Sequence, residues 1–181
     1  FGEMANRYVK IVCGRGNNGG DGAAVARQLW MRGALVDVVL LGKVDETNGD
    51  ARTNFDIVRS MAASGCGIGL REIGTRAEVW DEFEDSEPDL YVDAIFGTGL
   101  TRPAEGIFAD AIECLNNRAA TSLASLDLPS GLASDLPEPI GPHVVADLTV
   151  TFTAPKPSCV LPPAVFACGL VATAAIGSPE E

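Results

Sequence analysis

The chain has 181 residues, a net charge of −12 at pH 7 and an isoelectric point near 4.4. This length suits one domain with a substantial core. The acidic composition argues against nucleic acid or an anionic membrane as a partner, because both are bound by clustered Lys and Arg. Five scattered cysteines without a C-x-x-C pair favour neither a disulfide framework nor a zinc site. No apolar run reaches membrane-spanning length, and no secretory signal is visible, so a cytoplasmic protein is expected.

Apolar runs alternate with helical patterns along the chain, which is typical of a parallel sheet covered by helices on both faces. The expected strands are residues 9–13, 35–41, 71–73, 90–96, 122–126, 148–152 and 169–176. The expected helices are residues 23–32, 47–63 and 77–83, and a fourth with Ile107, Ala111, Ile112 and Leu115 on one face. Residues 154–163 are too rich in proline for regular structure. We therefore predict an α/β fold, a Rossmann-like three-layer αβα sandwich with a mostly parallel central sheet.

The first expected strand leads into a glycine-rich loop with two adjacent asparagines, Asn17 and Asn18. Glycines let backbone N–H groups approach a ligand, and the following helix directs its positive end to the same point. The alternative is a simple turn in which Asp21 is the N-cap of the helix and nothing is bound. Two asparagines between glycines favour the ligand, because a turn needs only one residue with positive φ.

The loop also fits the loose G-x-G-x-x-G pattern of redox dinucleotide-binding folds through Gly14, Gly16 and Gly19. Those folds place an acidic residue after the second strand to bind the ribose, whereas this chain has Gly42 and Lys43 there. No Lys-Ser or Lys-Thr pair follows the glycines, which excludes the nucleoside-triphosphate P-loop. A redox dehydrogenase is therefore a weak alternative.

Three strand ends carry polar residues, and the carboxyl ends of parallel strands meet at one edge of a sheet. Asn18, Asp93 and Ser130 would there supply a carbonyl, a carboxylate and a hydroxyl oxygen. This set suits a hard cation of low charge rather than zinc or copper. Asp93 lies inside an apolar strand, and its alternative role is to accept hydrogen bonds from neighbouring backbone N–H groups.

Asp127 follows the fifth expected strand and is a candidate general acid or base. Its alternative role is to form the turn that precedes Leu-Pro-Ser-Gly. Arg102 and Lys156 could neutralise phosphates, although single basic residues usually lie on the surface. His143, the only histidine, stands beside a proline in an expected exposed loop and is predicted to be solvated.

Four segments in order carry a resemblance to a known family. They are Gly16-Asn17-Asn18-Gly19-Gly20-Asp21-Gly22, Val92-Asp93-Ala94-Ile95-Phe96-Gly97-Thr98-Gly99-Leu100, Ser125-Leu126-Asp127-Leu128-Pro129-Ser130-Gly131, and Ala146-Asp147-Leu148-Thr149-Val150-Thr151-Phe152 with Ala154-Pro155-Lys156-Pro157. Together they cover nearly the whole chain and resemble the NAD(P)HX epimerases, the YjeF N-terminal domain family. The resemblance implies an isomerase of metabolite repair that interconverts the R and S epimers of hydrated NADH and NADPH.

The same resemblance implies the site residues, a potassium ion as cofactor and the partners. The residues implied to bind the substrate are Asn17, Asn18, Gly19, Gly20, Asp21, Gly97, Thr98, Gly99, Leu100, Thr101, Arg102, Pro103 and Asp127. Asp127 is the expected catalytic residue, and Asn18, Asp93 and Ser130 are the expected potassium ligands. The implied partners are a second copy of the chain, as a homodimer, and an NAD(P)HX dehydratase, which many bacterial members carry as a fused domain.

Residues 1–181 are expected to form a single domain of this type, without the helical segment with which members usually begin. The competing hypothesis is a non-catalytic nucleotide- or protein-binding module of the same fold. The presence of Asn18, Asp93, Asp127 and Ser130 favours the enzyme, because a scaffold does not need these side chains.

Overall fold

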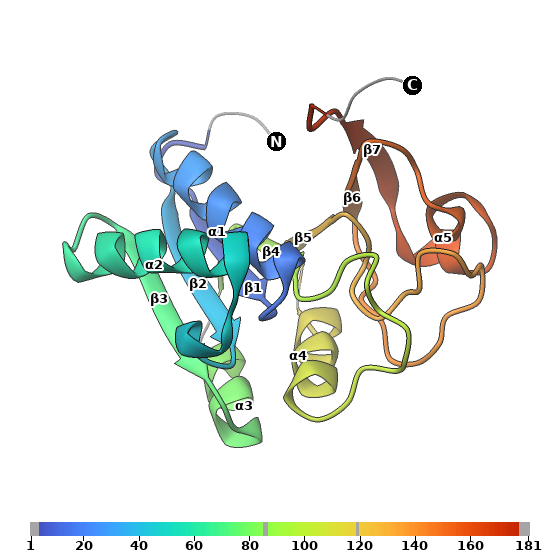
Figure 1. Cartoon of the computed structure of the whole chain (residues 1–181), viewed down its shortest axis with the longest axis horizontal. Helices are drawn as coiled ribbons and strands as arrows, with labels where there is room; N and C mark the ends of the chain where they lie inside the picture. Colours follow the sequence, from blue (N-terminus) through green and yellow to red (C-terminus); the bar gives the residue numbers. More distant parts are fainter. Residues whose placement is uncertain (1–3, 85–86, 119, 178–181) are drawn as a thin grey trace.

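The computed structural model describes residues 4–84, 87–118 and 120–177, which form one seven-stranded sheet with flanking helices (Figure 1). The strands are β1 (Tyr8–Cys13), β2 (Leu35–Leu41), β3 (Ile68–Ile73), β4 (Leu90–Ala94), β5 (Ser122–Leu126), β6 (Leu148–Phe152) and β7 (Leu170–Ala174). Their order in the sheet is β3-β2-β1-β4-β5-β6-β7, and each of the six neighbouring pairs is parallel. The predicted fold class is confirmed.

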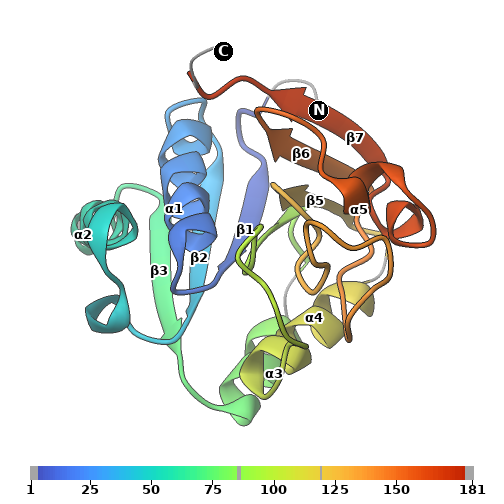
Figure 2. The ribbon, with the colours of Figure 1, turned by 45° about the vertical axis from the view of Figure 1, so that its right-hand side comes forward.

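The helices fill the connections between the strands. They are α1 (Asn17–Trp30), α2 (Gly49–Ala63), α3 (Arg76–Glu84), α4 (Ile107–Asn116) and α5 (Pro157–Val160), with 3-10 turns η1 (Val44–Glu46) and η2 (Ala164–Ala167). Figure 2 shows α1 beside α2 and, in another part of the molecule, α3 beside α4. None of the helices in the described part of the chain has the length and hydrophobicity that a bilayer crossing requires.

Successive side chains of each strand point to opposite faces of the sheet, so a separate hydrophobic core forms on each face. Val9 and Ile11 of β1 pack in one cluster with residues of α1 and α2, whereas Val12 packs in another with residues of α3 and α4. A third cluster lies at the C-terminal end, where Leu128 and Leu132 pack with Cys159. The segment between β6 and β7 was expected to be irregular, but its short turns α5 and η2 build this third cluster.

Helix α1 begins at Asn17, and the expected start at Ala23 is wrong. Glycines make the early start possible, because a Cβ at Gly19 would lie 1.8 Å from the carbonyl oxygen of Gly14 and one at Gly22 2.6 Å from the Cβ of Ala94. Close packing on the sheet therefore outweighs the helix cost of about 1 kcal/mol for each glycine. Asp21 lies in the second turn of α1, so the alternative of Asp21 as an N-cap is also wrong.

Four strands differ from the expected ranges. Strand β1 begins one residue earlier, at Tyr8, and β7 is shorter, Leu170–Ala174 rather than 169–176. Strand β3 begins at Ile68 rather than Arg71, because residues 68–70 continue the parallel pairing with β2. Strand β4 ends at Ala94 rather than Phe96. Ile95 and Phe96 thereby belong to the loop that reaches the edge of the sheet, which brings a backbone carbonyl into the candidate site.

Candidate functional site

A cleft of about 540 Å³ lies beyond the carboxyl ends of β1, β4 and β5. It sits where the chain order in the sheet changes direction, between β1 and β4, which is the usual ligand position in open parallel sheets. Nine of the expected site residues line it: Asn17, Asn18, Asp21, Gly97, Thr98, Gly99, Leu100, Arg102 and Asp127. The loops after three different strands thus meet at one place.

The N-terminus of α1 forms one wall of the cleft. Its N-cap is Gly16, which is extended and has no side chain, so no side-chain hydrogen bond caps the helix. Gly20 is the first residue whose N–H bonds back, to the carbonyl oxygen of Gly16 at 3.1 Å. The N–H groups of the first turn and the positive end of the helix dipole are therefore directed toward an anion in the cleft.

A buried polar network joins the other two loops to α1. Oδ1 of Asp93 accepts hydrogen bonds from Ser130 Oγ at 2.5 Å and from the N–H of Ile95 at 3.2 Å. Its Oδ2 accepts from Ser125 Oγ and from the N–H of Ser130, both at 2.8 Å. Burial raises the pKa of the Asp93 carboxyl, and these four hydrogen bonds oppose that rise. Asp93 thus accepts hydrogen bonds from two backbone N–H groups and two hydroxyls, and its role as a cation ligand stays a prediction.

Asn18 connects to this network through a backbone carbonyl. Its Nδ2 donates to the carbonyl oxygen of Phe96 at 2.9 Å, and Ser130 Oγ accepts from the N–H of Phe96 at 2.8 Å. The amide oxygen Oδ1 of Asn18 is buried and has no hydrogen-bond partner among the described residues. A buried carbonyl oxygen without a partner is costly unless it binds something. The three expected potassium ligands therefore lie together, and the oxygen set fits a hard cation of low charge.

Asp127 stands at the opposite wall in a strained backbone conformation. Its φ is 65°, in the left-handed region that residues other than glycine seldom adopt. Oδ1 accepts a hydrogen bond from Lys156 Nζ at 2.5 Å, and Oδ2 lies 3.1 Å from the position that a Cβ of Gly97 would take. The amide oxygen Oδ1 of Asn18 lies 3.4 Å from that same Cβ position. The carboxylate of Asp127 and the amide of Asn18 therefore both lie next to Gly97.

A second acidic residue, Asp21, also lines the cleft, close enough to Asp127 for the two charges to repel. Burial raises the pKa of the Asp21 carboxyl above its usual value, and the negative charge of Asp127 raises it further. The two acids therefore differ in their surroundings, because Asp127 has a lysine partner and Asp21 a carboxylate neighbour. A carboxyl in a cleft whose pKa is raised by burial and by a neighbouring charge is typical of functional sites.

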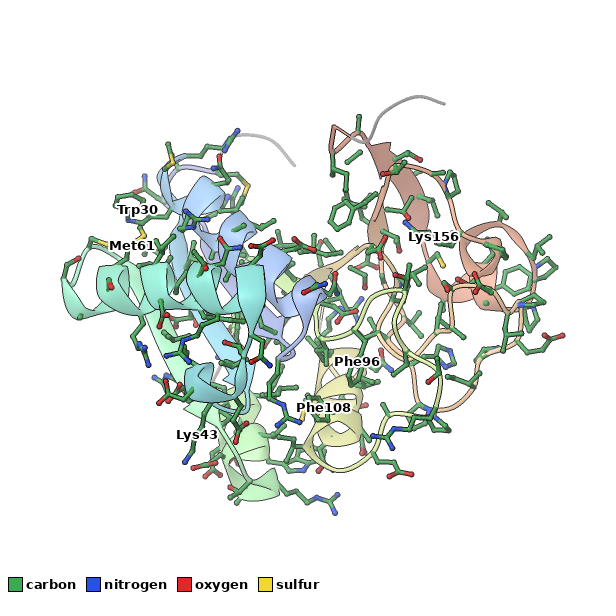
Figure 3. All side chains as sticks on the ribbon, viewed as in Figure 1. Trp30, Lys43, Met61, Phe96, Phe108 and Lys156 are labelled. Carbon is green, nitrogen blue, oxygen red and sulfur yellow. The ribbon has the colours of Figure 1, made fainter. Side chains whose placement is uncertain are left out.

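An apolar and cationic wall completes the cleft, and the sequence pattern did not reveal it. The rings of Phe96 and Phe108 lie 5.1 Å apart between centroids, and Figure 3 shows the two labelled side chains close together, with Phe108 in the first turn of α4. The guanidinium of Arg15 lies over Phe108 at 5.8 Å and pairs with Glu46 at 3.0 Å. No local signal in the sequence links Phe108 to Arg15, which lies far away in the chain.

Four expected binding residues do not line the cleft. Gly19 and Gly20 are buried in α1, and Thr101 and Pro103 lie farther along the second glycine loop. His143 is also away from the cleft, half-buried, with its Nδ1 2.9 Å from the carbonyl oxygen of Gly141. Lys156 had been considered for phosphate binding, but its ammonium is engaged by Asp127 instead.

Comparison with known proteins agrees with this architecture. A 42% identical relative is the bifunctional NAD(P)H-hydrate repair enzyme Nnr of Moorella thermoacetica, where the match covers 99% of this chain and 33% of the relative. The NAD(P)H-hydrate epimerase of Rhodobacter capsulatus is 40% identical over 86% of this chain and 68% of its own. The chain thus spans about a third of the length of the bifunctional relative.

Among solved structures, the crystal structure of yeast ynu0 matches with a TM-score of 0.73 and 22% identity, over 97% of this chain and 68% of the yeast chain. This likeness shows the shared fold. The family model described as YjeF-related protein N-terminus matches residues 1–158, which include all three converging loops. The chain therefore belongs to the YjeF-related protein N-terminus family.

Proposed function

We propose that this protein is an NAD(P)HX epimerase, which interconverts the R and S epimers of hydrated NADH and NADPH. The observation that carries the proposal is the position of Asp127, which lines the cleft with its Oδ2 beside Gly97, where the glycine loops after β1 and β4 meet. The names of relatives that are about 40% identical support the same activity.

In this proposal the pyrophosphate of the substrate binds at the N-terminus of α1. The uncapped N–H groups of the first turn suit that anion, and Arg102 adds positive charge on the cleft wall. The hydrated ring then lies toward Asp127, between the second glycine loop and the strand β5. Phe96 and Phe108 are partly buried and line the cleft, so they offer apolar contact to the substrate.

The reaction needs acid–base chemistry without electron transfer. The epimeric carbon carries a hydroxyl group beside the ring nitrogen, so its configuration inverts when the hydroxyl leaves with a proton and water returns to the other face. Asp127 is positioned to exchange that proton, and general acid–base catalysis of this kind contributes about 10²–10⁴-fold to rate. The proton count and the oxidation state of the substrate are the same before and after the step.

We also propose a potassium ion next to this cleft. Asn18 would hold it through Oδ1, with Asp93 and Ser130 supplying the negative charge and a further oxygen. The buried Oδ1 of Asn18, which has no hydrogen-bond partner among the described residues, supports this proposal because a cation would satisfy it. The bound ion would supply positive charge beside the anionic substrate, while the residues named here bind and orient it.

As partners we propose a second copy of this chain and an NAD(P)HX dehydratase. A dehydratase that accepts only the S epimer would remove the product and draw the epimerisation forward. Support for the homodimer comes from the apolar edge strand β7, whose Leu170 is 71% exposed.

The epimerase is tested with purified R-NADHX, an S-specific dehydratase and ATP, with consumption followed by absorbance. We expect the R form to be consumed faster than by spontaneous epimerisation, in proportion to the amount of this protein. Asp127→Asn, which keeps the shape of the side chain, should lower the rate by about 100-fold or more. Consumption of R-NADHX at the spontaneous rate would remove the proposal and leave a binding module.

A further inference from the structure

Lys156 makes a set of contacts that no surface lysine needs. Its Nζ donates to Oδ1 of Asp127 at 2.5 Å, to Oγ1 of Thr151 at 2.9 Å and to the carbonyl oxygen of Phe152 at 2.8 Å. An ammonium has three N–H bonds, so all of them are used inside the protein. Its side chain is 17% exposed. The ammonium of Lys156 is therefore held in place by the protein, and none of its N–H groups is left to bind a substrate.

The hydrogen bonds to Asp127 are unequal between its two oxygens. Oδ1 accepts from Lys156 and, at 3.4 Å, from the N–H of Phe152. Oδ2 lies toward Gly97 and the cleft. Oδ1 is held by two hydrogen bonds, whereas Oδ2 lies beside Gly97. The hydrogen bonds to Oδ1 therefore fix the rotation of the carboxylate about the Cβ–Cγ bond.

The backbone of Asp127 also needs this anchor. A residue other than glycine at φ 65° is strained and persists only where surrounding contacts hold it. The side chain of Asp127 is only 10% exposed, and a buried charge requires a partner. In Figure 3 Lys156 lies on the β6 side of the molecule, apart from Phe96 and Phe108. Lys156 is not among the residues that line the cleft, whereas its partner Asp127 is.

We infer that Lys156 is the positioning residue of the site: its ammonium holds Oδ1 of Asp127 and thereby aims Oδ2 at the reacting carbon. The inference rests on the proposed epimerase function and adds a residue to it. Misplacement of a reacting group by about 1 Å can cost about 100-fold in rate, which sets the scale of the expected effect.

The main test compares kcat and KM of Lys156→Met and Lys156→Arg with wild type in the coupled assay. Lys156→Met keeps the aliphatic stem, and we expect kcat to fall by about 100-fold while KM changes less than about threefold. Lys156→Arg keeps the charge and should recover part of kcat. A wild-type kcat in Lys156→Met would overturn the inference.

A matched control separates positioning from general stability. Lys10 is likewise buried in an ion pair, with Glu82, but it lies in β1 on the α3 side of the sheet and does not line the cleft. Lys10→Met should lower the melting temperature and leave kcat within about twofold of wild type. Equal losses of kcat in the Lys10 and Lys156 variants would show a merely structural role for Lys156.

Two further measurements keep the inference falsifiable if Lys156→Met folds poorly. Thr151→Val removes one of the three acceptors of the ammonium and should lower kcat about fivefold without changing KM. Lys156→Ala should regain activity when ethylammonium is added, and tetramethylammonium, which has no N–H donor, should not restore it. Failure of rescue together with an unchanged Thr151→Val would overturn the positioning role. Absence of activity in the wild type would instead refute the proposed function.

Discussion

Asn18 uses the two ends of one amide for different purposes. Its Nδ2 donates to Phe96 and so joins α1 to the loop after β4, while its Oδ1 is left buried without a partner. Its neighbour Asn17 lines the cleft but has no part in this network. The two asparagines look equivalent in the sequence, yet burial and partners separate a residue suited to a cation from one suited to the substrate.

This difference predicts how each variant responds to potassium. Loss of the amide oxygen in Asn18→Ala should raise the potassium concentration for half-maximal activity about tenfold, because a contact to a charge is worth roughly 1.5 kcal/mol. Asn17→Ala should keep the wild-type value even where its KM for substrate rises. The measurement is rate against potassium at constant ionic strength, with choline as the replacing cation. A wild-type rate that does not depend on potassium would contradict the proposed ion.

At the scale of the element, helix α1 shows why the glycines are needed. Gly19 lies against Gly14, and Gly20 lies against α2, where a Cβ would be 2.6 Å from the Cα of Ala51. The glycines of α1 therefore allow close packing of the helix, in addition to forming a loop that suits a ligand. Their second function, the approach of N–H groups to an anion, follows from the position at which this packing places the first turn.

Gly19→Ala should destabilise the fold, because its Cβ would lie 1.8 Å from a backbone oxygen that cannot move away cheaply. We expect a loss of about 1–3 kcal/mol in the free energy of unfolding, measured by urea denaturation. Gly99→Ala is the control, since no atom lies within 4 Å of its Cβ, and it should stay within about 0.5 kcal/mol of wild type. Equal stabilities for the two variants would argue against the close packing of α1.

On the scale of the whole molecule, the two ends of the sheet differ in how far helices cover them. The β1 to β3 half is covered by α1 and α2, whereas β7 is an edge strand with apolar side chains in solvent. Leu170 is 71% exposed, and Phe166 and Ile176 beside it in the chain are 77% and 61% exposed. Unpaired edge strands of this kind are suited to pairing with another chain.

The proposed homodimer therefore predicts a specific weak point. Leu170→Glu should place a charge at the interface and shift the protein to monomer at micromolar concentration, as measured by sedimentation velocity. Ile57→Glu changes a half-exposed apolar residue on α2, near the opposite end of the sheet, and should leave the dimer intact. A wild-type protein that sediments as a monomer would contradict the proposal.

Much of the fold and part of the site could be predicted from local pattern. Strand and helix periodicity, the glycine loop and polar residues at strand ends are properties of short segments, so they identified the parallel sheet and grouped Asn18, Asp93 and Ser130 at one edge of it. The structure places these three side chains in one network.

Only the tertiary structure decided where α1 begins, which wall Phe108 forms and what Lys156 contacts. Lys156 and Asp127 are 29 positions apart, and the sequence carries no sign of their pairing because the contact exists only once β6 lies beside β5. Likewise, position 19 requires a glycine because the backbone of Gly14 lies against the helix there in the folded chain. Secondary structure and glycine loops depend on neighbouring residues and can be predicted from the sequence. Contacts between distant segments depend on how the whole chain packs.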